Sequence, residues 1–316
     1  MKTFILITLL YTLIFVFGIN AFNVTISDRD LANYEKETNI KKNIKFNGKR
    51  LLDVYYDKND TKNKKKVVIY IYGSAWTNGD KIGQTKIGSL LQSEDYVAVI
   101  PNYVLFPNGC VEDMVDDVYK AINWTYKNIS KYGGDKKKIY VCGHSSGAHL
   151  TALTFIKSTL HLKNKGIPLK SLPALKKIIL LNGPYAFDQE FIAYNLKSLG
   201  GMSPVAQDIE QQLLLQQLMV KYIMDESISP VAILKKLKKN SISNKFNVEK
   251  LVFFYTSDDA VIPESSSKQL MTELLRISQC SLEYIYEEGL GHSTITDGVR
   301  DDNEKYNEWF MNIIRS

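Results

Sequence analysis

The sequence is organised around the segment Lys138-Ile139-Tyr140-Val141-Cys142-Gly143-His144-Ser145-Ser146-Gly147-Ala148-His149-Leu150. After the lysine it opens with a β-branched and aromatic run, which predicts a short buried strand. The pattern Gly-x-Ser-x-Gly follows, and residues 149–157 then favour a helix. A strand, a sharp turn and a helix in this order raise a serine hydroxyl above the end of a sheet. Ser145 is therefore the candidate nucleophile.

The two glycines of this pattern have a steric explanation. A turn that lifts a serine off the end of a strand brings the following helix very close to that strand. Glycine has no Cβ to clash there, and it also tolerates backbone conformations that strain other residues. Gly143 and Gly147 are therefore expected to allow this close approach.

Composition limits the class of protein. A chain of 316 residues with 45% hydrophobic content can bury one large core, so we expect a single catalytic domain over residues 22–316. The net charge of +6 comes from lysines interspersed with acidic residues, apart from the run Lys62-Asn63-Lys64-Lys65-Lys66. That run precedes an apolar segment and is interpreted as a solvated loop, so nucleic-acid binding is not expected.

The N-terminal segment indicates targeting. Residues 4–18 are almost wholly apolar and follow Lys2, which predicts a signal peptide or an uncleaved signal anchor over residues 1–21. We therefore expect a protein of the secretory pathway (endoplasmic reticulum or Golgi lumen or membrane, or secreted), with membrane association through this segment if it is retained. Glycosylation sequons begin at Asn23, Asn59, Asn123 and Asn128, and the first two fall in expected loops.

The cysteines Cys110, Cys142 and Cys280 are too few and too scattered for a disulfide framework. Cys142 lies in the predicted strand before the nucleophile and is expected to be a buried apolar side chain. Stability is therefore expected to come from the hydrophobic core.

The remaining pattern predicts an α/β protein. Residues 40–46 and 51–56 are expected to form an antiparallel strand pair around Asn47-Gly48. Nearly unbroken apolar runs follow, which are typical of strands buried on both faces, and helical sequence lies between most of them. They occupy residues 67–72, 96–100, 138–142, 177–181, 251–255 and 282–286, and the clearest helix is 111–131. We expect a mostly parallel eight-stranded sheet flanked by helices.

A departure from this alternation falls at about residues 184–247. Helical patterns at 188–199, 203–224 and 229–239 have no strands between them, so we interpret the region as a helical cap over the carboxyl end of the sheet. Most apolar residues of the predicted helix at 203–224 are expected to pack against the body of the protein. A few of them could line a hydrophobic acyl or prenyl pocket.

A serine nucleophile requires a base, and the chain has only four histidines. His144 and His149 are fixed beside the nucleophile, and His161 lies where the same helix ends, as a structural or surface residue. His292 follows the last predicted strand in the Gly-rich segment 288–293, from which a side chain can project over the sheet edge. His292 is therefore the candidate base.

A carboxylate is needed to orient that base, and the segment 255–263 follows the preceding predicted strand. Asp259 fits better than Asp258, although both could belong to an exposed acidic turn. The choice gives the chain order Ser, Asp, His, which occurs in hydrolases built on parallel sheets.

Donors for a developing oxyanion are expected in the turn Tyr72-Gly73-Ser74-Ala75-Trp76. Its small residues let backbone N–H groups face a substrate carbonyl, so the candidate donors are the amides of Gly73, Ser74 and Ser146. The sequence has no nucleotide-type phosphate loop, zinc spacing or calcium loop, so neither a cofactor nor a metal is expected.

These motifs resemble a known family. Four segments look like those of α/β-hydrolase esterases of the carboxylesterase and lipase type: 72–76, 132–135, 143–149 and 259–263. Three more are similar to isoprenylcysteine methylesterases: Trp76-Thr77-Asn78-Gly79-Asp80-Lys81, Gly88-Ser89-Leu90-Leu91 and Phe106-Pro107-Asn108-Gly109. The resemblance implies an α/β-hydrolase fold, a catalytic triad of Ser145, Asp259 and His292, and an oxyanion turn at Gly73 and Ser74.

The turn departs from the family at one position of consequence. Most relatives have His-Gly-Gly where this chain has Tyr72-Gly73-Ser74, and the methylesterase branch also lacks the histidine. Ser74 replaces a glycine, and its Cβ could narrow the oxyanion hole or turn its N–H.

The leading hypothesis is a serine esterase that cleaves a small-molecule or lipid-like carboxylic ester. An isoprenylcysteine methyl ester is favoured by resemblance. An arylformamidase or amidase of the kynurenine formamidase type is one alternative, and a catalytically silent hydrolase-like binding protein is the other.

Overall fold

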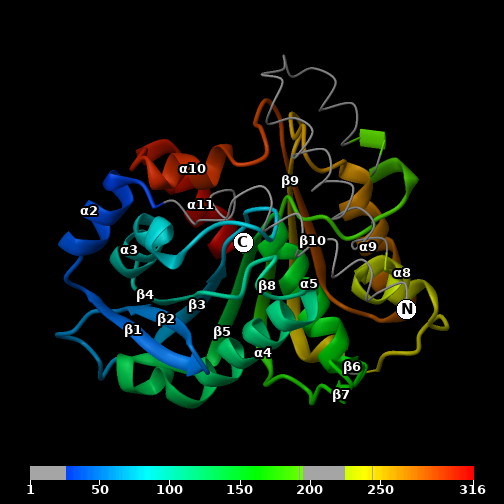
Figure 1. Ribbon diagram of the computed structural model, residues 1–316, viewed down its shortest axis with the longest axis horizontal. Coiled ribbons are helices and arrows are strands. Elements are labelled where there is room, and N and C mark those ends of the chain that lie inside the picture. The colour runs from blue at the N-terminus through cyan, green and yellow to red at the C-terminus, as the bar shows by residue number, and fades with distance from the viewer. Residues whose placement is uncertain (1–25, 192, 195–224, 244) are drawn as a thin grey trace, which may run out of the picture.

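The computed structural model describes residues 26–191, 193–194, 225–243 and 245–316 (Figure 1). The predicted leader at 1–21, the sequon at Asn23 and the predicted cap helix at 203–224 lie outside the described residues. Within the described ranges, no helix combines the length and the apolar character needed to cross a membrane.

One sheet of eight strands runs through the protein in the order β1-β2-β4-β3-β5-β8-β9-β10. β1 pairs antiparallel with β2, and β2 antiparallel with β4, whereas the other neighbours are parallel. The mostly parallel eight-stranded sheet is thus confirmed, with the antiparallel pair at one edge. The strands are β1 (Ile40–Asn47), β2 (Arg50–Tyr55), β3 (Lys65–Ile71), β4 (Tyr96–Pro101), β5 (Gly134–His144), β8 (Leu175–Leu181), β9 (Val248–Thr256) and β10 (Leu282–Glu287).

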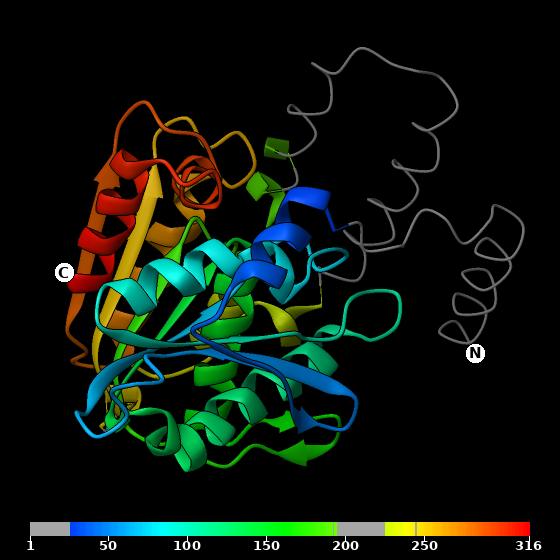
Figure 2. The same ribbon diagram turned by 90° about the vertical axis from the view of Figure 1, so that its left-hand side faces the viewer.

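Helices cover both faces of this sheet, as Figure 2 shows from the side. One layer contains α2 (Asp28–Lys36), α3 (Thr85–Ser93), α10 (Thr294–Arg300) and α11 (Glu304–Arg315). The other contains α4 (Val111–Asn128), α5 (Ser146–Thr159), α8 (Pro230–Lys235) and α9 (Glu264–Ile277). Short 3-10 turns are η2 (Lys81–Gln84), η3 (Ile129–Tyr132), η4 (Glu226–Ile228) and η5 (Lys245–Asn247), and a small hairpin joins β6 (Lys163–Asn164) to β7 (Ile167–Pro168).

The core lies between these layers because the central strands are apolar on both faces. Every residue of β4 is buried, and in β3 only the second residue is exposed. Large side chains fill the space between strands and helices, notably Tyr55, Tyr70, Tyr72, Tyr185 and Phe155. Cys142 is fully buried, as predicted, and all three cysteines are thiols.

Parallel strands place the candidate site residues along one edge of the sheet. β3, β5, β9 and β10 all run in the same direction, so their carboxyl ends meet. Gly73 follows β3, Ser145 follows β5, Asp259 follows β9 and His292 follows β10. Four segments that are distant in sequence thereby converge.

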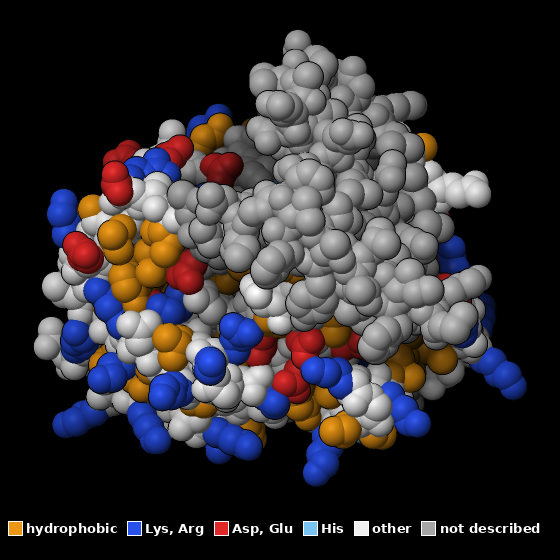
Figure 3. Space-filling model, viewed as in Figure 1, with side chains coloured by type: hydrophobic (Ala, Val, Ile, Leu, Met, Phe, Trp, Pro, Cys, Tyr) orange, Lys and Arg blue, Asp and Glu red, His pale blue; other side chains and the backbone are white. Residues whose placement is uncertain are grey.

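The lysine run at 62–66 differs from its prediction as a solvated loop. Lys65 begins β3 and is only 8% exposed. Its ammonium group forms ion pairs with Asp57, Asp60 and Asp95. Three carboxylates compensate the cost of burying this charge, which is how a lysine can enter a strand. On the face shown in Figure 3, basic side chains lie along the lower part with acidic and apolar side chains between them.

Two of the predicted helices differ from the structure in their length. The helix expected at 229–239 is shorter in the structure, where α8 spans only Pro230–Lys235. The helix expected at 111–131 divides into α4 and η3, and Gly133 ends it with a left-handed φ of 80°. Of the sequons within the described residues, Asn59 is exposed before β3, whereas the side-chain amides of Asn123 and Asn128 donate to carbonyls of α4.

A buried ion pair ties the edge of the sheet to the segment after β3. Lys81 Nζ donates to Asp53 Oδ2, Asn43 Oδ1 and Tyr34 OH, each at 2.9 Å. Asp53 is fully buried and Lys81 is 2% exposed. Burial raises the pKa of Asp53, although the adjacent ammonium group opposes that shift. These hydrogen bonds of Lys81 thus anchor the C-terminal end of the segment 72–81 to β1, β2 and α2.

We predict that Lys81→Met lowers the free energy of unfolding by about 3 kcal/mol, because it leaves the Asp53 carboxylate buried without its partner. The control is Lys268→Met, which breaks the more exposed pair with Glu264 and should cost less than about 1 kcal/mol. Urea denaturation of both variants measures the difference. If both variants lost the same free energy of unfolding, the stabilising role of the buried Lys81–Asp53 pair would be contradicted.

Candidate active site

The turn at Ser145 is sharp and strained. β5 ends at His144 and α5 begins at Ser146, so a single residue changes the direction of the chain. Ser145 has φ 52° and ψ −123°, a conformation that residues with a Cβ rarely adopt. Its N–H donates to the carbonyl of Leu181 at 2.8 Å, which ties the turn to β8. This is the strand, turn and helix arrangement predicted from the sequence.

The flanking glycines allow this turn for the predicted reason. A Cβ on Gly143 would lie 2.6 Å from the carbonyl oxygen of Gly147. A Cβ on Gly147 would lie 2.1 Å from the carbonyl oxygen of Ile71 at the end of β3. Real Cβ atoms do not approach backbone oxygen this closely, so both positions require glycine.

The structure brings Ser145, His292 and Asp259 together in one hydrogen-bonded chain. His292 Nε2 lies 2.8 Å from Ser145 Oγ, and His292 Nδ1 lies 2.7 Å from Asp259 Oδ2. This spacing fits a neutral imidazole that donates from Nδ1 to the carboxylate and accepts from the serine hydroxyl. Asp258, the second choice from the sequence, is exposed and accepts instead from Ser257 Oγ. His161 is exposed, and its ring contacts the Leu169 carbonyl.

Asp259 is held in its ionised form by its surroundings. Its Oδ2 accepts from Asn182 Nδ2 at 2.7 Å, and its Oδ1 accepts from the amides of Val261 and Ile262, each at 2.8 Å. Burial alone would raise the pKa of Asp259, but the hydrogen bonds from His292, Asn182 and Ile262 hold it below its ordinary value. An ionised carboxylate in this position can orient the imidazole and stabilise a positive charge on it.

His144 has a contact that the sequence did not reveal. Its Nε2 lies 3.0 Å from the carbonyl oxygen of His292, and the two ring centroids are 5.1 Å apart. Burial lowers the pKa of His144 to about 3, and the nearby His292 adds to this effect. The neutral ring therefore donates from Nε2 and fixes the backbone that carries His292. The only signal in the sequence was its position directly before Ser145, the candidate nucleophile.

The turn after β3 lies against Ser145. A Cβ on Gly73 would fall 2.6 Å from Ser145 Cβ, so only glycine fits there. The Ser74 N–H donates to Ser146 Oγ at 2.9 Å. The N–H of Ser146 is in the first turn of α5, where a helix leaves its amides without intrahelical acceptors. The structure thus places all three predicted oxyanion donors near Ser145, with the Ser74 amide bonded to the neighbouring hydroxyl.

Tyr72, the first residue of this turn, contacts the far end of the turn at Gly79. Its hydroxyl lies 3.2 Å from Asn102 Oδ1 and 3.4 Å from the carbonyl of Gly79. Gly79 has φ 102°, and a Cβ there would lie 2.7 Å from the Tyr72 ring. The aromatic ring therefore spans the base of the turn and joins its two ends.

A cavity of about 450 Å³ opens over these residues, which is within the size range of ligand sites. Its walls include Gly73, Ser74, Ser145, His292, Thr296 and Arg300. Within the ranges that the structure describes, no group of three or more His, Cys, Asp or Glu side chains could hold a metal ion. Because Ser145 and His292 lie on the wall of this cavity and are hydrogen-bonded to each other, the cavity suits nucleophilic and acid–base chemistry.

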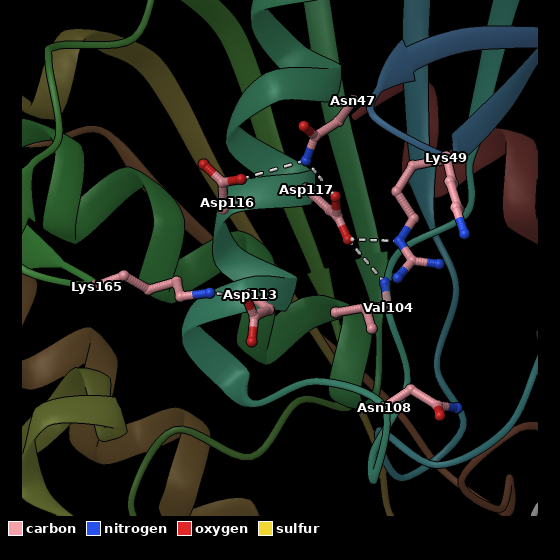
Figure 4. A pocket seen from close by; sticks show the side chains of 9 residues that line it. Asn47, Lys49, Val104, Asn108, Asp113, Asp116, Asp117 and Lys165 are labelled. Carbon is pink, nitrogen blue, oxygen red and sulfur yellow. Dashed lines mark hydrogen bonds and ion pairs between the residues drawn. The ribbon is translucent and has the colours of Figure 1, made fainter.

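A second cavity of about 460 Å³ lies beside α4 and is lined by charged side chains (Figure 4). Its acidic groups already have partners. Asp117 accepts from Asn47, Arg50 and the Val104 amide, and Lys165 pairs with Asp113. The bonds from Asn47 and Arg50 join the hairpin of β1 and β2 to α4, and the Lys165–Asp113 pair joins the turn between β6 and β7 to the same helix. The charged side chains around this cavity therefore have a structural role.

Acid should weaken the fold through two buried histidines. Burial lowers the pKa of His144 to about 3 and that of His149 to about 4, whereas unfolded histidine titrates near 6.5. Between these values the unfolded chain binds more protons, so the free energy of unfolding falls as pH drops below about 6.5. At pH 5 the expected loss is about 2 kcal/mol per ring.

Urea denaturation at pH 7 and pH 5 checks this prediction. His149→Gln removes one of the two titrating groups and should abolish about half of their combined loss of stability. A variant that retains the full dependence on pH would show that His149 does not contribute.

Comparisons with known proteins agree with this geometry. The chain is 27% identical over 241 residues to a probable isoprenylcysteine alpha-carbonyl methylesterase of Arabidopsis thaliana, covering 75% of this chain and 47% of that protein. It is 23% identical over 253 residues to esterase LipC of Mycobacterium tuberculosis, covering 79% and 59%. The chain thus spans about half the length of the curated relatives it matches.

Among solved structures, a hyperthermophilic esterase from the archaeon Pyrobaculum calidifontis is similar in fold. The TM-score is 0.65 at 16% identity, and the match covers 90% of this chain and 89% of that one. These comparisons confirm the predicted resemblance to esterases of the α/β-hydrolase fold. The BD-FAE family model matches residues 52–274, well over half of the 316 residues, and the chain belongs to the BD-FAE family.

Proposed function

We propose that this protein is a carboxylic ester hydrolase that works through an acyl-enzyme. Ser145 is the nucleophile, His292 the general base and Asp259 the residue that orients it. One observation carries the proposal: the continuous chain from Ser145 Oγ through the His292 ring to Asp259, at 2.8 and 2.7 Å, on the wall of a cavity. Esterase is also the name given to the similar proteins.

The proposed reaction follows from these contacts. Ser145 Oγ attacks the ester carbonyl carbon as its proton passes to His292 Nε2, and Asp259 stabilises the imidazolium that forms. The tetrahedral intermediate expels the alcohol, which takes the proton from His292. Water then attacks the acyl group with His292 again as base, and the acid is released.

The oxyanion formed in each step needs hydrogen-bond donors. We assign this role first to the amides of Gly73 and Ser146. The Ser74 amide is the third donor, and it must exchange its bond to Ser146 Oγ for the oxyanion. Each donor of this kind typically contributes about 3 kcal/mol to transition-state stabilisation.

For the substrate, we propose the methyl ester of a prenylated cysteine. Several similar proteins carry the name isoprenylcysteine alpha-carbonyl methylesterase, which supports this choice. The cavity of about 450 Å³ provides room for an ester of this size class. From residues 1–21 we also propose entry into the secretory pathway, with a location in the lumen or membrane of the endoplasmic reticulum or Golgi, or outside the cell.

A substrate panel tests the reaction type. We expect the wild-type protein to hydrolyse p-nitrophenyl esters and the methyl ester of S-farnesyl-N-acetylcysteine faster than N-formylkynurenine, judged by kcat/KM. Ser145→Ala should lower kcat by at least about 10⁴-fold. Ser93→Ala, at an exposed serine on α3, serves as the control and should retain full activity. Faster cleavage of the formamide would overturn the assignment as an esterase.

Asp259→Asn should lower kcat for the same esters by about 10⁴-fold, because an amide no longer holds His292 in the required tautomer. Asp258→Asn provides a matched control at the neighbouring exposed carboxylate and should stay close to wild type. Steady-state kinetics of both variants decide between the two positions. A loss confined to Asp258→Asn would refute the assignment of Asp259.

A further inference from the structure

We propose that His149 is a positioning residue that couples the oxyanion turn to the chain segment around Ile228. The inference rests on the proposed esterase function and adds a residue that determines how the oxyanion donors are held. His149 lies in α5, one turn beyond the nucleophile, and it is fully buried.

Both ring nitrogens of His149 are engaged, and their partners fix its tautomer. Trp76 Nε1 lies 3.1 Å from His149 Nδ1, and an indole N–H can only donate, so Nδ1 is an acceptor. His149 Nε2 lies 2.8 Å from the carbonyl oxygen of Ile228, which can only accept, so Nε2 carries the hydrogen. A neutral histidine therefore links Trp76 to Ile228 in a single chain of hydrogen bonds.

The Trp76 end of this chain belongs to the turn that holds the oxyanion donors. Ala75 has φ 48° and Trp76 has φ 63°, two consecutive non-glycine residues in the left-handed region. Such conformations persist only where surrounding contacts fix them. The bond to His149 is one such contact, and the Trp76 carbonyl accepts from the Phe106 amide at 2.9 Å as another. Gly73 and Ser74 directly precede this strained pair.

The Ile228 end belongs to the segment that enters α8. Ser229 Oγ lies 3.2 Å from the carbonyl of Tyr185, and the Val231 amide donates to the same oxygen at 3.1 Å. These bonds tie the segment to the chain that leaves β8. A displacement of this segment would therefore reach His149 through the Ile228 carbonyl.

Aromatic packing keeps the His149 ring in place between these two ends. The centroid distances are 5.3 Å to Trp76 and 5.2 Å to Phe187, both edge to face. Phe187 in turn packs against Phe191 with centroids 5.3 Å apart. The ring therefore has little freedom except to move with the groups that it joins.

A histidine that only fills the core would affect stability and the fraction of folded protein. A positioning residue affects the rate of each active site. The test therefore measures kcat per active site, with the sites counted by complete labelling with a fluorophosphonate. The variants are His149→Gln, His149→Leu, Trp76→Phe and the double variant Trp76→Phe/His149→Leu.

We expect a characteristic pattern. His149→Gln can accept from Trp76 and donate to Ile228, so its kcat per site should stay within about 3-fold of wild type. His149→Leu and Trp76→Phe should each lower kcat by about 10- to 100-fold with little change in KM. This decrease is smaller than that caused by removing a whole oxyanion donor, which lowers kcat by about 10²- to 10³-fold. The double variant should lose no more than the worse single variant, because both remove the same link.

Three results for the variants would overturn the inference. One is His149→Leu with wild-type kcat per site, and another is a double variant whose losses multiply. If His149→Leu does not fold, a Trp76→Phe protein with unchanged kcat per site is decisive in its place. A wild-type protein that neither binds the fluorophosphonate nor cleaves any ester would overturn the proposed function, and the coupling with it.

Discussion

The close approach of α5 to the ends of β3 and β5 is the constraint on which the rest of the site depends. Because Gly143 and Gly147 have no Cβ, the helix can begin immediately after the strand, and Ser145 is forced into its strained conformation. The same approach brings the turn after β3 against Ser145, and only a glycine fits at position 73 of that turn. One steric requirement thus positions both Ser145, the proposed nucleophile, and the proposed oxyanion donors.

The other proposed catalytic groups are held by hydrogen bonds from neighbouring elements. Asn182, at the end of β8, bonds to Asp259 after β9, and His144, at the end of β5, bonds to the backbone of His292 after β10. Residues at the ends of β8 and β5 therefore support residues that follow β9 and β10. Since buried dipoles of this kind keep their orientation during a reaction, the arrangement suits the stabilisation of transient charge.

Sequence patterns predicted those features that depend on neighbouring residues. Apolar runs identified the strands, and the glycine spacing around Ser145 identified the turn. His292 was found because the other histidines were excluded by their positions. Contacts between distant segments could not be predicted in this way: no local pattern shows that His149 joins Trp76 to Ile228, or that Lys65 meets three carboxylates. Those contacts depend on which side chains the completed fold brings together.

The proposed mechanism requires that Ser145 is a nucleophile activated by His292 and Asp259. Its most direct test is reaction of the wild-type protein with a fluorophosphonate, followed by peptide mass spectrometry. We predict one adduct per chain, located on Ser145, and none on the Ser145→Ala protein under the same conditions. An unmodified Ser145 in folded wild-type protein, or an adduct on a different residue, would contradict this mechanism.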